Sequence, residues 1–265
     1  MAGARPDLRP TIDRGWLEEA ARRDPLAHAY ALWDLAQAPD RMQVVSALDG
    51  DRTIGYLLIW LGHPGAPVVH WIGSDPRAGV LAEALPPRPL VAIVPEEFRD
   101  AAVRARGPVE EHALLGFAAD PLLAERGYPP EEGVRRLEPA DRDHLVRWAS
   151  HQTDPVVTEY ARGDPATEPI WGAFRGSELV GVVRASVRLP LIWVLGGVYV
   201  DPIARGQGIG RALVRTVQRA AAAVGAPTAL FVRADRYPAR ALYESLGFRP
   251  VATRRWLDAG AGLAP

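Results

Sequence analysis

The chain has 265 residues, 48% of them hydrophobic, and a formal net charge of −1 at pH 7. That length suits one large or two ordinary domains, and the balanced charge gives no electrostatic case for a nucleic-acid partner. Cysteine is absent, which excludes disulfides, cysteine-bound zinc and a thiol nucleophile.

Three other sequence patterns are absent, and this narrows the class of protein further. The six histidines are scattered without an H-E-x-x-H pairing, so we expect no metal site. No apolar stretch reaches the length of a membrane span, and the N-terminal sequence MAGARPDLRP lacks the apolar core of a signal peptide. We therefore expect a cytoplasmic protein with neither a membrane nor a nucleic acid as partner.

The first half of the chain alternates helical patterns with short apolar runs. Asp13 is suited to cap the first helix, and the sequence DGDR marks a hairpin turn. The predicted order is a helix over 11–23, a helix over 28–35, strands over 43–47, 53–61 and 68–72, a helix over 77–85, a strand over 90–94, a helix over 96–105 and a strand over 112–117.

A proline-rich stretch over 118–133 separates this half from the next and is the predicted linker. We expect domains over 1–120 and 134–265 with a linker over 121–133, in an α/β fold with a mixed sheet. The predicted order in the second half is a strand over 134–137, a helix over 141–148, an irregular polar segment over 151–167, hairpin strands over 170–174 and 179–187, a strand over 192–200, a helix from 209, a strand over 228–232, a helix near 238–246 and a strand over 251–257 that closes the sheet.

The most informative stretch runs from Val198 to Arg211, VYVDPIARGQGIGR. Pro202 ends the strand because proline offers no amide hydrogen to the ladder. Three alternating glycines follow and allow a tight turn and the close approach of a bulky anion. A helix opens at Ile209, and the unpaired amides of its first turn form an anion site.

Three phosphate-binding patterns compete for this turn. A P-loop needs Gly-Lys-Ser/Thr, and all 31 basic residues of this chain are arginine. A dinucleotide-binding turn needs G-x-G-x-x-G with an acid about 20 residues later, where this chain has Leu230. The pattern present, R-x-x-G-x-G after a strand, resembles the coenzyme A loop of the GCN5-related N-acetyltransferase (GNAT) superfamily. A plain glycine-rich turn is the alternative.

A second stretch, ARALYESLGF over 239–248, is also similar to that superfamily. A strand, a short helix with Leu-Tyr and then Gly-Phe is its pattern, in which the helix tyrosine points at the thioester sulfur. The resemblance makes Tyr243 the catalytic acid, since an unperturbed pKa of about 10 suits protonation of a leaving thiolate. The alternative is that Tyr243 only packs the core.

The resemblance implies acetyl-CoA as co-substrate, with no metal, and a set of residues that bind it. Strand amides would polarise the thioester carbonyl and pair with the pantetheine arm, while the turn would grip the pyrophosphate. The implied residues are Val198, Tyr199, Val200, Arg205, Gly206, Gln207, Gly208, Ile209, Gly210, Arg211 and Arg236.

Two positions depart from the family pattern. Arg236 stands where the family usually has an asparagine, and Phe231 stands where relatives that acetylate protein N-termini carry a glutamate base. Candidate bases by location alone are Asp154, Glu159 and Asp235, with a base reached through water as an equal alternative. Trp171 and Trp193 are candidates for an apolar acceptor pocket or, alternatively, core residues.

The first half shows the element order of an acetyltransferase domain, but its corresponding turn is GSDPRAG, without the R-x-x-G-x-G pattern. We therefore interpret it as a degenerate GNAT-like copy. Such an architecture resembles both the glycine N-acyltransferase-like (FR47-like) branch and the mycothiol synthase type of the superfamily. The alternative is an unrelated α/β domain of similar size. A role of the first half as an interaction domain that docks a partner or forms a homodimer is compatible with both.

The sequence therefore predicts an acyl-CoA-dependent N-acyltransferase, with acetyl as the expected group, that acts by direct attack of a primary amine. The acceptor is a small-molecule amine or the N-terminus of a protein or peptide. The alternative is a non-catalytic module that binds acyl-CoA as a sensor, which the substitutions at Phe231 and Arg236 would suit.

Overall fold

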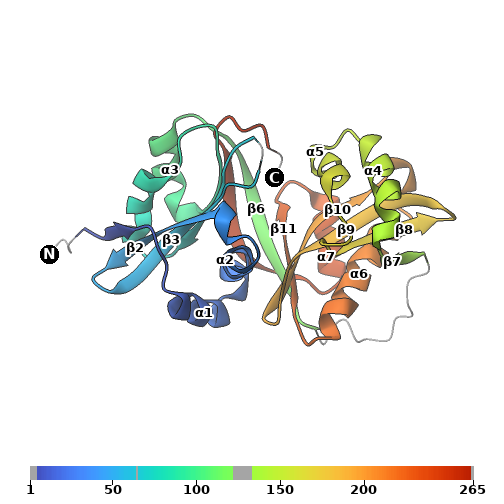
Figure 1. The fold of residues 1–265 in the computed structure, drawn as a ribbon, viewed down its shortest axis with the longest axis horizontal. Helices are drawn as coiled ribbons and strands as arrows, with labels where there is room; N and C mark the ends of the chain where they lie inside the picture. The colour runs from blue at the N-terminus through green and yellow to red at the C-terminus, as the bar shows by residue number, and fades with distance from the viewer. Residues whose placement is uncertain (1–4, 64, 122–132, 264–265) are drawn as a thin grey trace.

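The computed structural model describes residues 5–63, 65–121 and 133–263. Its strands form one 12-stranded mixed sheet, and helices cover both faces (Figure 1). The order across the sheet is β1-β2-β3-β4-β5-β12-β6-β11-β10-β9-β8-β7. No helix among the described residues is both long and apolar enough to cross a membrane.

The elements before the predicted linker follow the order expected from the sequence, except that an unpredicted edge strand, β1, precedes the first helix. They are β1 (Asp7–Arg9), α1 (Arg14–Arg23), α2 (Pro25–Gln37), η1 (Pro39–Arg41), β2 (Met42–Asp49), β3 (Arg52–Trp60), β4 (Val68–Gly73), η2 (Pro76–Ala84), β5 (Val91–Pro95), η3 (Glu96–Phe98), α3 (Arg99–Arg106) and β6 (Glu110–Ala119), where η denotes a 3-10 helix.

The elements after it also follow the expected order, except that the segment expected to be irregular over 151–167 contains the short helices α5 and η6. They are β7 (Val134–Arg136), η5 (Pro139–Asp141), α4 (Arg142–Ser150), α5 (Pro155–Thr158), η6 (Glu159–Arg162), β8 (Ile170–Arg175), β9 (Glu178–Leu189), β10 (Ile192–Val200), η7 (Pro202–Ala204), α6 (Ile209–Ala222), β11 (Thr228–Arg233), α7 (Tyr237–Ser245) and β12 (Arg249–Asp258). The predicted α/β fold with a mixed sheet is confirmed.

Local chemistry explains where most elements begin. The Asp13 carboxylate accepts a hydrogen bond from the Trp16 amide at 2.6 Å and caps α1, as expected. Helix α2 begins three residues earlier than predicted because Asp24 caps it and Pro25 suits the first helical position. The hairpin between β2 and β3 turns at Gly50, whose φ is +62°.

One element differs in type from its prediction. The segment expected as a helix over 77–85 is the 3-10 helix η2. Ala78 lies against the glycine pair Gly55 and Gly73, and its Cβ is 2.9 Å from the place where a side chain on Gly55 would begin. This tight packing on the sheet, which no local pattern encodes, accompanies the tighter winding.

The two halves exchange their last strands. Strand β12 does not close the sheet, as the sequence analysis expected, but lies between β5 and β6 and is antiparallel to both. Strand β6 in turn pairs with β11 of the second half. The expectation is wrong because hydrophobic alternation identifies a strand but does not specify which strands it pairs with. The predicted linker falls mostly on 122–132, outside the described residues, so the domain boundary stays a prediction.

Helices α1, α2 and α4 lie on one face of the sheet, and η2, α3, α6 and α7 lie on the other. Alternate residues of each strand divide between them, so that Leu57 packs toward η2 while Leu58 packs toward α1. Helix α2 also covers the second half, because Leu26 and Ala29 pack against Val194 of β10. The first half therefore supplies part of the layer that covers the second.

Candidate active site

Strands β10 and β11 run parallel side by side and then separate. Their ladder joins Trp193–Leu195 to Thr228–Leu230. Beyond Leu195, β10 continues against β9 only, while β11 continues against β6. Within the described residues, the rest of β10 therefore has no strand neighbour on the β11 side. This separation is the splay that an acyl-CoA arm would need.

A bulge in β10 lies where the splay begins. The pairing with β9 shifts register between Gly196 and Tyr199, and Gly197 has a φ of +58°. The Tyr160 hydroxyl donates to the Gly197 carbonyl at 2.8 Å. A Cβ on Gly197 would lie 2.5 Å from that hydroxyl, so only glycine fits there. The phenol of Tyr160 therefore holds the bulge.

The bulge reverses the side chains of β10, since a one-residue slip exchanges the two faces. Before it, Val194 packs toward α2; after it, Val198 and Val200 pack toward α6. The Asp201 amide donates to Val180 of β9 at 2.9 Å. The backbone N–H and C=O groups of successive strand residues point to opposite sides of the strand. Because those of Asp201 face β9, those of Val198 and Val200 point into the splay.

The loop after β10 has the geometry of an anion site. Gly206 and Gly208 have φ values of +74° and +80°, and a Cβ on either would meet nothing within 4 Å. Both glycines are therefore required by backbone conformation, and the space beside them is open. Gly208 caps α6, whose first amides have no partner within the helix.

The predicted cationic groups flank this loop in different ways. Arg205 is exposed and its Nε donates to the Val200 carbonyl at 3.0 Å. Its guanidinium lies 5.4 Å from the centre of the Tyr199 ring. Arg211 lies half-buried in the first turn of α6, and Arg236 is the exposed cap of α7.

The remaining predicted contacts lie on the same loop and helix. The Gln207 side chain donates to the Ile203 carbonyl at 3.3 Å, and half-buried Ile209 begins α6 and packs against the core below it. A Cβ on Gly210 would lie 3.3 Å from Leu242 of α7. Gly210 thus brings α6 and α7 together, and with them the loop and the Tyr243 helix.

A polar network that the sequence analysis did not anticipate fixes the end of β10. The Asp201 carboxylate accepts hydrogen bonds from the Trp148 indole at 3.0 Å and the Gln152 amide at 2.9 Å. The Tyr199 hydroxyl donates to Gln152 at 3.2 Å. Burial raises the pKa of Asp201. Helix α4 is thereby tied to the strand end that precedes the glycine loop.

Tyr243 lies on α7 within the core cluster that α6 and the sheet share. Its side chain is 7% exposed, and its ring packs edge-to-face on Phe248 with centroids 5.9 Å apart. Burial raises the pKa of Tyr243 to about 12, so its hydroxyl keeps its proton at neutral pH. The side chain is thus both a core residue and a protonated donor.

The three candidate bases lie in different surroundings. Asp235 is exposed and forms a two-fold ion pair with Arg233, which lowers the pKa of that carboxyl and makes it a poorer base. Asp154 lies in the loop before α5, where its carbonyl accepts from the Val157 amide at 2.9 Å. Glu159 lies 3.6 Å from the guanidinium of Arg184, near the β10 bulge.

The two candidate tryptophans lie in the core beneath α6. Trp171 is 6% exposed and belongs to the core cluster there, and Trp193 packs against the same cluster. Their ring centroids are 6.4 Å apart. These surroundings match the alternative interpretation, in which both tryptophans are core residues. Among the described residues, no three His, Asp or Glu side chains gather closely enough to hold a metal ion.

In the first half, the corresponding turn lies before η2, and the side chain of its own residue Asp75 occupies it. The Asp75 carboxylate accepts from the Arg77 amide at 3.0 Å and pairs with the Arg77 guanidinium at 2.9 Å. Trp71 is 1% exposed and stacks on Phe98 with centroids 4.9 Å apart. A carboxylate thus occupies the turn that the second half leaves open, and the two rings pack in the core beneath η2.

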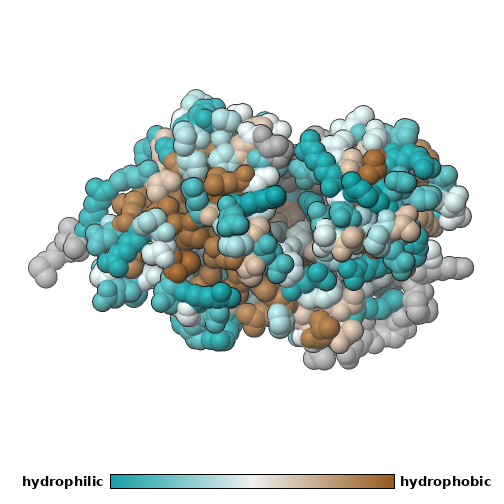
Figure 2. Space-filling model, viewed as in Figure 1, coloured by the Kyte–Doolittle hydropathy of each residue, from teal (hydrophilic) through white to brown (hydrophobic). Residues whose placement is uncertain are grey.

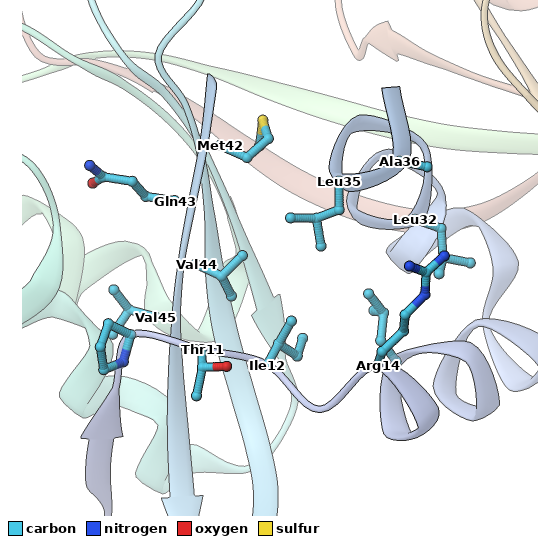
Figure 3. Close-up of a pocket in the computed structure, with 12 residues that line it drawn as sticks. Thr11, Ile12, Arg14, Leu32, Leu35, Ala36, Met42, Gln43, Val44 and Val45 are labelled. Atoms are coloured by element: carbon cyan, nitrogen blue, oxygen red, sulfur yellow. The ribbon is translucent and has the colours of Figure 1, made fainter. Parts of the chain in front are cut away.

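A pocket of about 700 Å³ lies elsewhere, in the first half. Figure 3 shows Ile12, Leu35 and Val44 pointing into the space between β2 and the first two helices. Its polar lining consists of Thr11, Arg14 and Gln43. This pocket does not include any residue of the glycine loop.

Comparison with known proteins gives the family. Residues 134–248 match the model of the acetyltransferase (GNAT) family. A mycothiol acetyltransferase of Streptomyces scabiei is 43% identical over 147 residues, a match that covers 49% of this chain and 45% of that protein. The chain therefore spans about half the length of that curated relative.

Solved structures agree on the fold across nearly the whole chain. A Drosophila protein superposes with a TM-score of 0.71 at 17% identity, covering 95% of this chain and 97% of its own. A tandem GNAT protein from the clavulanic acid biosynthesis pathway superposes with a TM-score of 0.60 at 18% identity, covering 98% of this chain and 100% of its own. The expected GNAT-like first half is confirmed at the level of fold. Residues 134–248 therefore form a domain of the acetyltransferase (GNAT) family, and the fold of the whole chain is similar to that of the tandem GNAT protein.

Proposed function

We propose that the second half of this chain transfers an acetyl group from acetyl-CoA to a primary amine by direct attack. The observation that carries the proposal is the open glycine loop at the start of α6, directly after the splayed end of β10. The loop offers helix amides to a pyrophosphate, and the splay offers strand amides to a pantetheine arm and its thioester. The family match over 134–248 supports this chemistry.

The chemistry assigns a role to each group. The amine nitrogen attacks the thioester carbonyl, and amides of Val198 and Val200 that face the splay stabilise the oxyanion. As the carbon–sulfur bond breaks, the Tyr243 hydroxyl gives its proton to the thiolate. The attacking amine loses a proton to Glu159, directly or through water. Tyr243 is then restored by proton exchange with solvent.

The proposed acceptor is a small-molecule amine. The curated relative is named for mycothiol, a small molecule, and its match covers about half of this chain. The protein N-terminus is the weaker alternative because Phe231 replaces the glutamate expected of such enzymes and is half-buried against the core under α2.

The test is a calorimetric titration of acetyl-CoA into the wild type and into Gly208→Trp. The indole would occupy the open space beside the loop, on a residue whose φ of +80° also disfavours any side chain. We expect saturable binding in the wild type and a loss of at least ten-fold in affinity in the variant.

The matched control is Gly176→Trp. Gly176 also has a positive φ, +57°, and open space around it, but it lies in the β8–β9 hairpin turn. It carries the same backbone strain without touching the loop, so its affinity should equal that of the wild type. Absence of acetyl-CoA binding in the wild type would overturn the proposed function.

A further inference from the structure

Strand β2 of the first half has an edge that its neighbour β1 covers only in part. Strand β1 pairs with residues 46–48 of β2 and then ends, because the next residue, Pro10, has no amide hydrogen for the ladder. The chain leaves the sheet toward α1, and the Ser46 hydroxyl donates to the Thr11 carbonyl at 2.6 Å. Within the described residues, 42–45 therefore have no strand neighbour on this side. We call 42–45 the free edge of β2.

The backbone groups that face outward on the free edge are those of Met42 and Val44. On the other side of β2, the Arg41 carbonyl accepts from the Leu61 amide at 2.8 Å, so the groups of Arg41 face β3. The N–H and C=O groups of successive strand residues point to opposite sides, and those of Met42 and Val44 therefore point away from β3. An edge of this kind is a template for a further strand.

The pocket of about 700 Å³ lies beside the free edge, and we call it the β2 groove. Figure 3 shows the side chains of Met42, Val44, Ile12 and Leu35 around one space, and all four are partly buried. Figure 2 shows apolar side chains gathered on this face of the molecule between β2 and α2. A strand on the free edge would gain main-chain hydrogen bonds and would bury alternate side chains in the groove.

The free edge is short and is closed at both ends. Strand β1 lies in line with the open position at one end, and η1 comes directly before β2 at the other. Four extended residues span about 13 Å, so the edge takes a short segment. A second copy that paired antiparallel through its own β2 would bring β1 of each copy against η1 of the other, and Arg9 against Arg41. This geometry favours a peptide segment over a second copy.

Charge indicates which peptide fits. Arg41 precedes the free edge and Arg9 lies on β1 beyond its other end; both are exposed, and neither forms an ion pair within the described residues. Arg14 lines the β2 groove, 3.3 Å from Glu18 of the same helix. In the described part of the chain, no Asp or Glu lines the groove. Acidic residues at the two ends of a bound segment would therefore meet cations on both sides.

We propose that the free edge of β2 docks an extended segment of another polypeptide by antiparallel strand addition. The segment has apolar side chains at alternate positions, which enter the β2 groove, and an acidic residue at each end. Met42 and Val44 pair with its main chain, and Arg9 and Arg41 attract its acids. The docking site does not depend on the proposed acetyl transfer, because it shares no residue with the glycine loop.

The experiment titrates a synthetic peptide into the wild-type chain and follows the fluorescence anisotropy of a dye on the peptide. The probe is N-acetylated and C-amidated, and valine and serine alternate in it between two terminal glutamates. We expect saturable binding and, by hydrogen exchange with mass spectrometry, slower exchange of the amides of 42–45. A peptide with arginine at both ends should bind about ten-fold more weakly because it meets Arg9 and Arg41 with like charge.

Two N-methylated forms of the probe test the strand pairing. In an antiparallel addition, the residues opposite Met42 and Val44 share both their face and their hydrogen bonds. The valines occupy those positions, so methyl groups on the valine amides should abolish binding, and methyl groups on the serine amides should leave the affinity unchanged. Binding that survives methylation of the valine amides, or that is lost with both forms, would overturn strand addition.

A double variant tests the two arginines. Arg9→Glu combined with Arg41→Glu should weaken binding of the acidic probe by about ten-fold, because two attractions become repulsions. The matched control combines Arg136→Glu and Arg175→Glu, which make the same change of charge on exposed residues of β7 and β8, at the far side of the sheet. The control should bind the probe as the wild type does, and both double variants should keep the wild-type melting temperature and acetyl-CoA affinity.

Two further results would contradict the proposal. If decanoate binds the β2 groove and the peptide does not, the groove takes an apolar acid rather than a strand. If sedimentation shows a dimer of the wild type that dissociates in the Arg9→Glu and Arg41→Glu double variant, the occupant is a second copy of this chain.

Discussion

Tyr243 is a core residue that the proposed function also makes the proton donor. Its ring packs on Phe248 within the cluster beneath α6, while burial keeps the hydroxyl protonated by raising its pKa to about 12. A protonated phenol is the form that can give a proton to a leaving thiolate. These surroundings are compatible with both interpretations that its sequence pattern left open, and the catalytic one stays a proposal.

Tyr243→Phe is expected to keep acetyl-CoA affinity and lose turnover by about 10²- to 10⁴-fold, the usual contribution of a positioned general acid. The phenyl ring retains the contact with Phe248, so the melting temperature should change little. Calorimetry and CoA-release kinetics measure the two quantities. Unchanged kcat would return Tyr243 to a packing role, and no turnover in the wild type with any amine would favour the acyl-CoA sensor.

Asp34 of α2 makes stability depend on pH. Burial raises the pKa of its carboxyl from 3.8 to about 7. Between these values the folded state holds a proton that the unfolded chain releases, so the free energy of unfolding falls as pH rises from about 4 to about 7. Above pH 7 the half-buried carboxylate is charged, and the folded state carries the full cost of desolvating it.

Asp34→Asn should therefore melt at the same temperature as the wild type near pH 4 and at a higher temperature at pH 8. The gain is about 2–4 °C for each kcal/mol recovered in a chain of this size. Thermal unfolding followed by circular dichroism measures it. Asp40→Asn, on an exposed residue in the following 3-10 turn, is the control and should melt at the wild-type temperature at both pH values.

At the scale of elements, the two strand–turn–helix units of the chain differ in what occupies the turn. In the second half the glycines before α6 leave the helix amides open. In the first half Asp75 fills the corresponding position at η2, and Trp71 and Phe98 fill the space below. A carboxylate at a helix N-terminus takes the place that a phosphate would otherwise take.

The first half should accordingly bind no acetyl-CoA, and the titration of the wild type should give one molecule per chain. In Gly208→Trp the fitted number of sites should fall from one toward zero. A residual site in that variant would show that the first half binds the ligand despite Asp75.

At the scale of the whole molecule, the exchanged strands join both halves into one sheet. Strand β12 of the second half pairs with β5 of the first, and β6 of the first half pairs with β11 of the second. The last strand of each half therefore pairs with a strand of the other half. Helix α2 adds a common layer by packing on strands of both halves. Unfolding one half therefore exposes the core of the other.

The chain should therefore unfold in one cooperative transition, with coincident curves from far-ultraviolet circular dichroism and tryptophan fluorescence. Arg255→Pro, in β12 between β5 and β6, should lower that single melting temperature strongly because proline breaks a central ladder. Arg255→Ala removes the same exposed ion pair with Glu96 and should cost little. Two separated transitions would show that the predicted domains over 1–120 and 134–265 unfold independently.

The sequence by itself determined the local parts of this protein. Glycines at 206 and 208, Pro202 and the helical spacing from Ile209 act within a few residues, so the turn and the helix start could be read directly. The same holds for the hairpin at Gly50 and the cap at Asp13. Such features depend on backbone conformation and neighbouring amides, which the local sequence specifies.

Only the tertiary structure decided which distant groups meet. The pairing of Arg184 with Glu159, the hold of Tyr160 on Gly197 and the approach of His63 join segments that no spacing connects. The place of β12 between β5 and β6 is of the same kind. Hydrophobic alternation determines which face of a strand is buried but not which strand it pairs with. The exchange of β6 and β12, and the arrangement of the candidate active site, therefore follow from the packing of the whole chain.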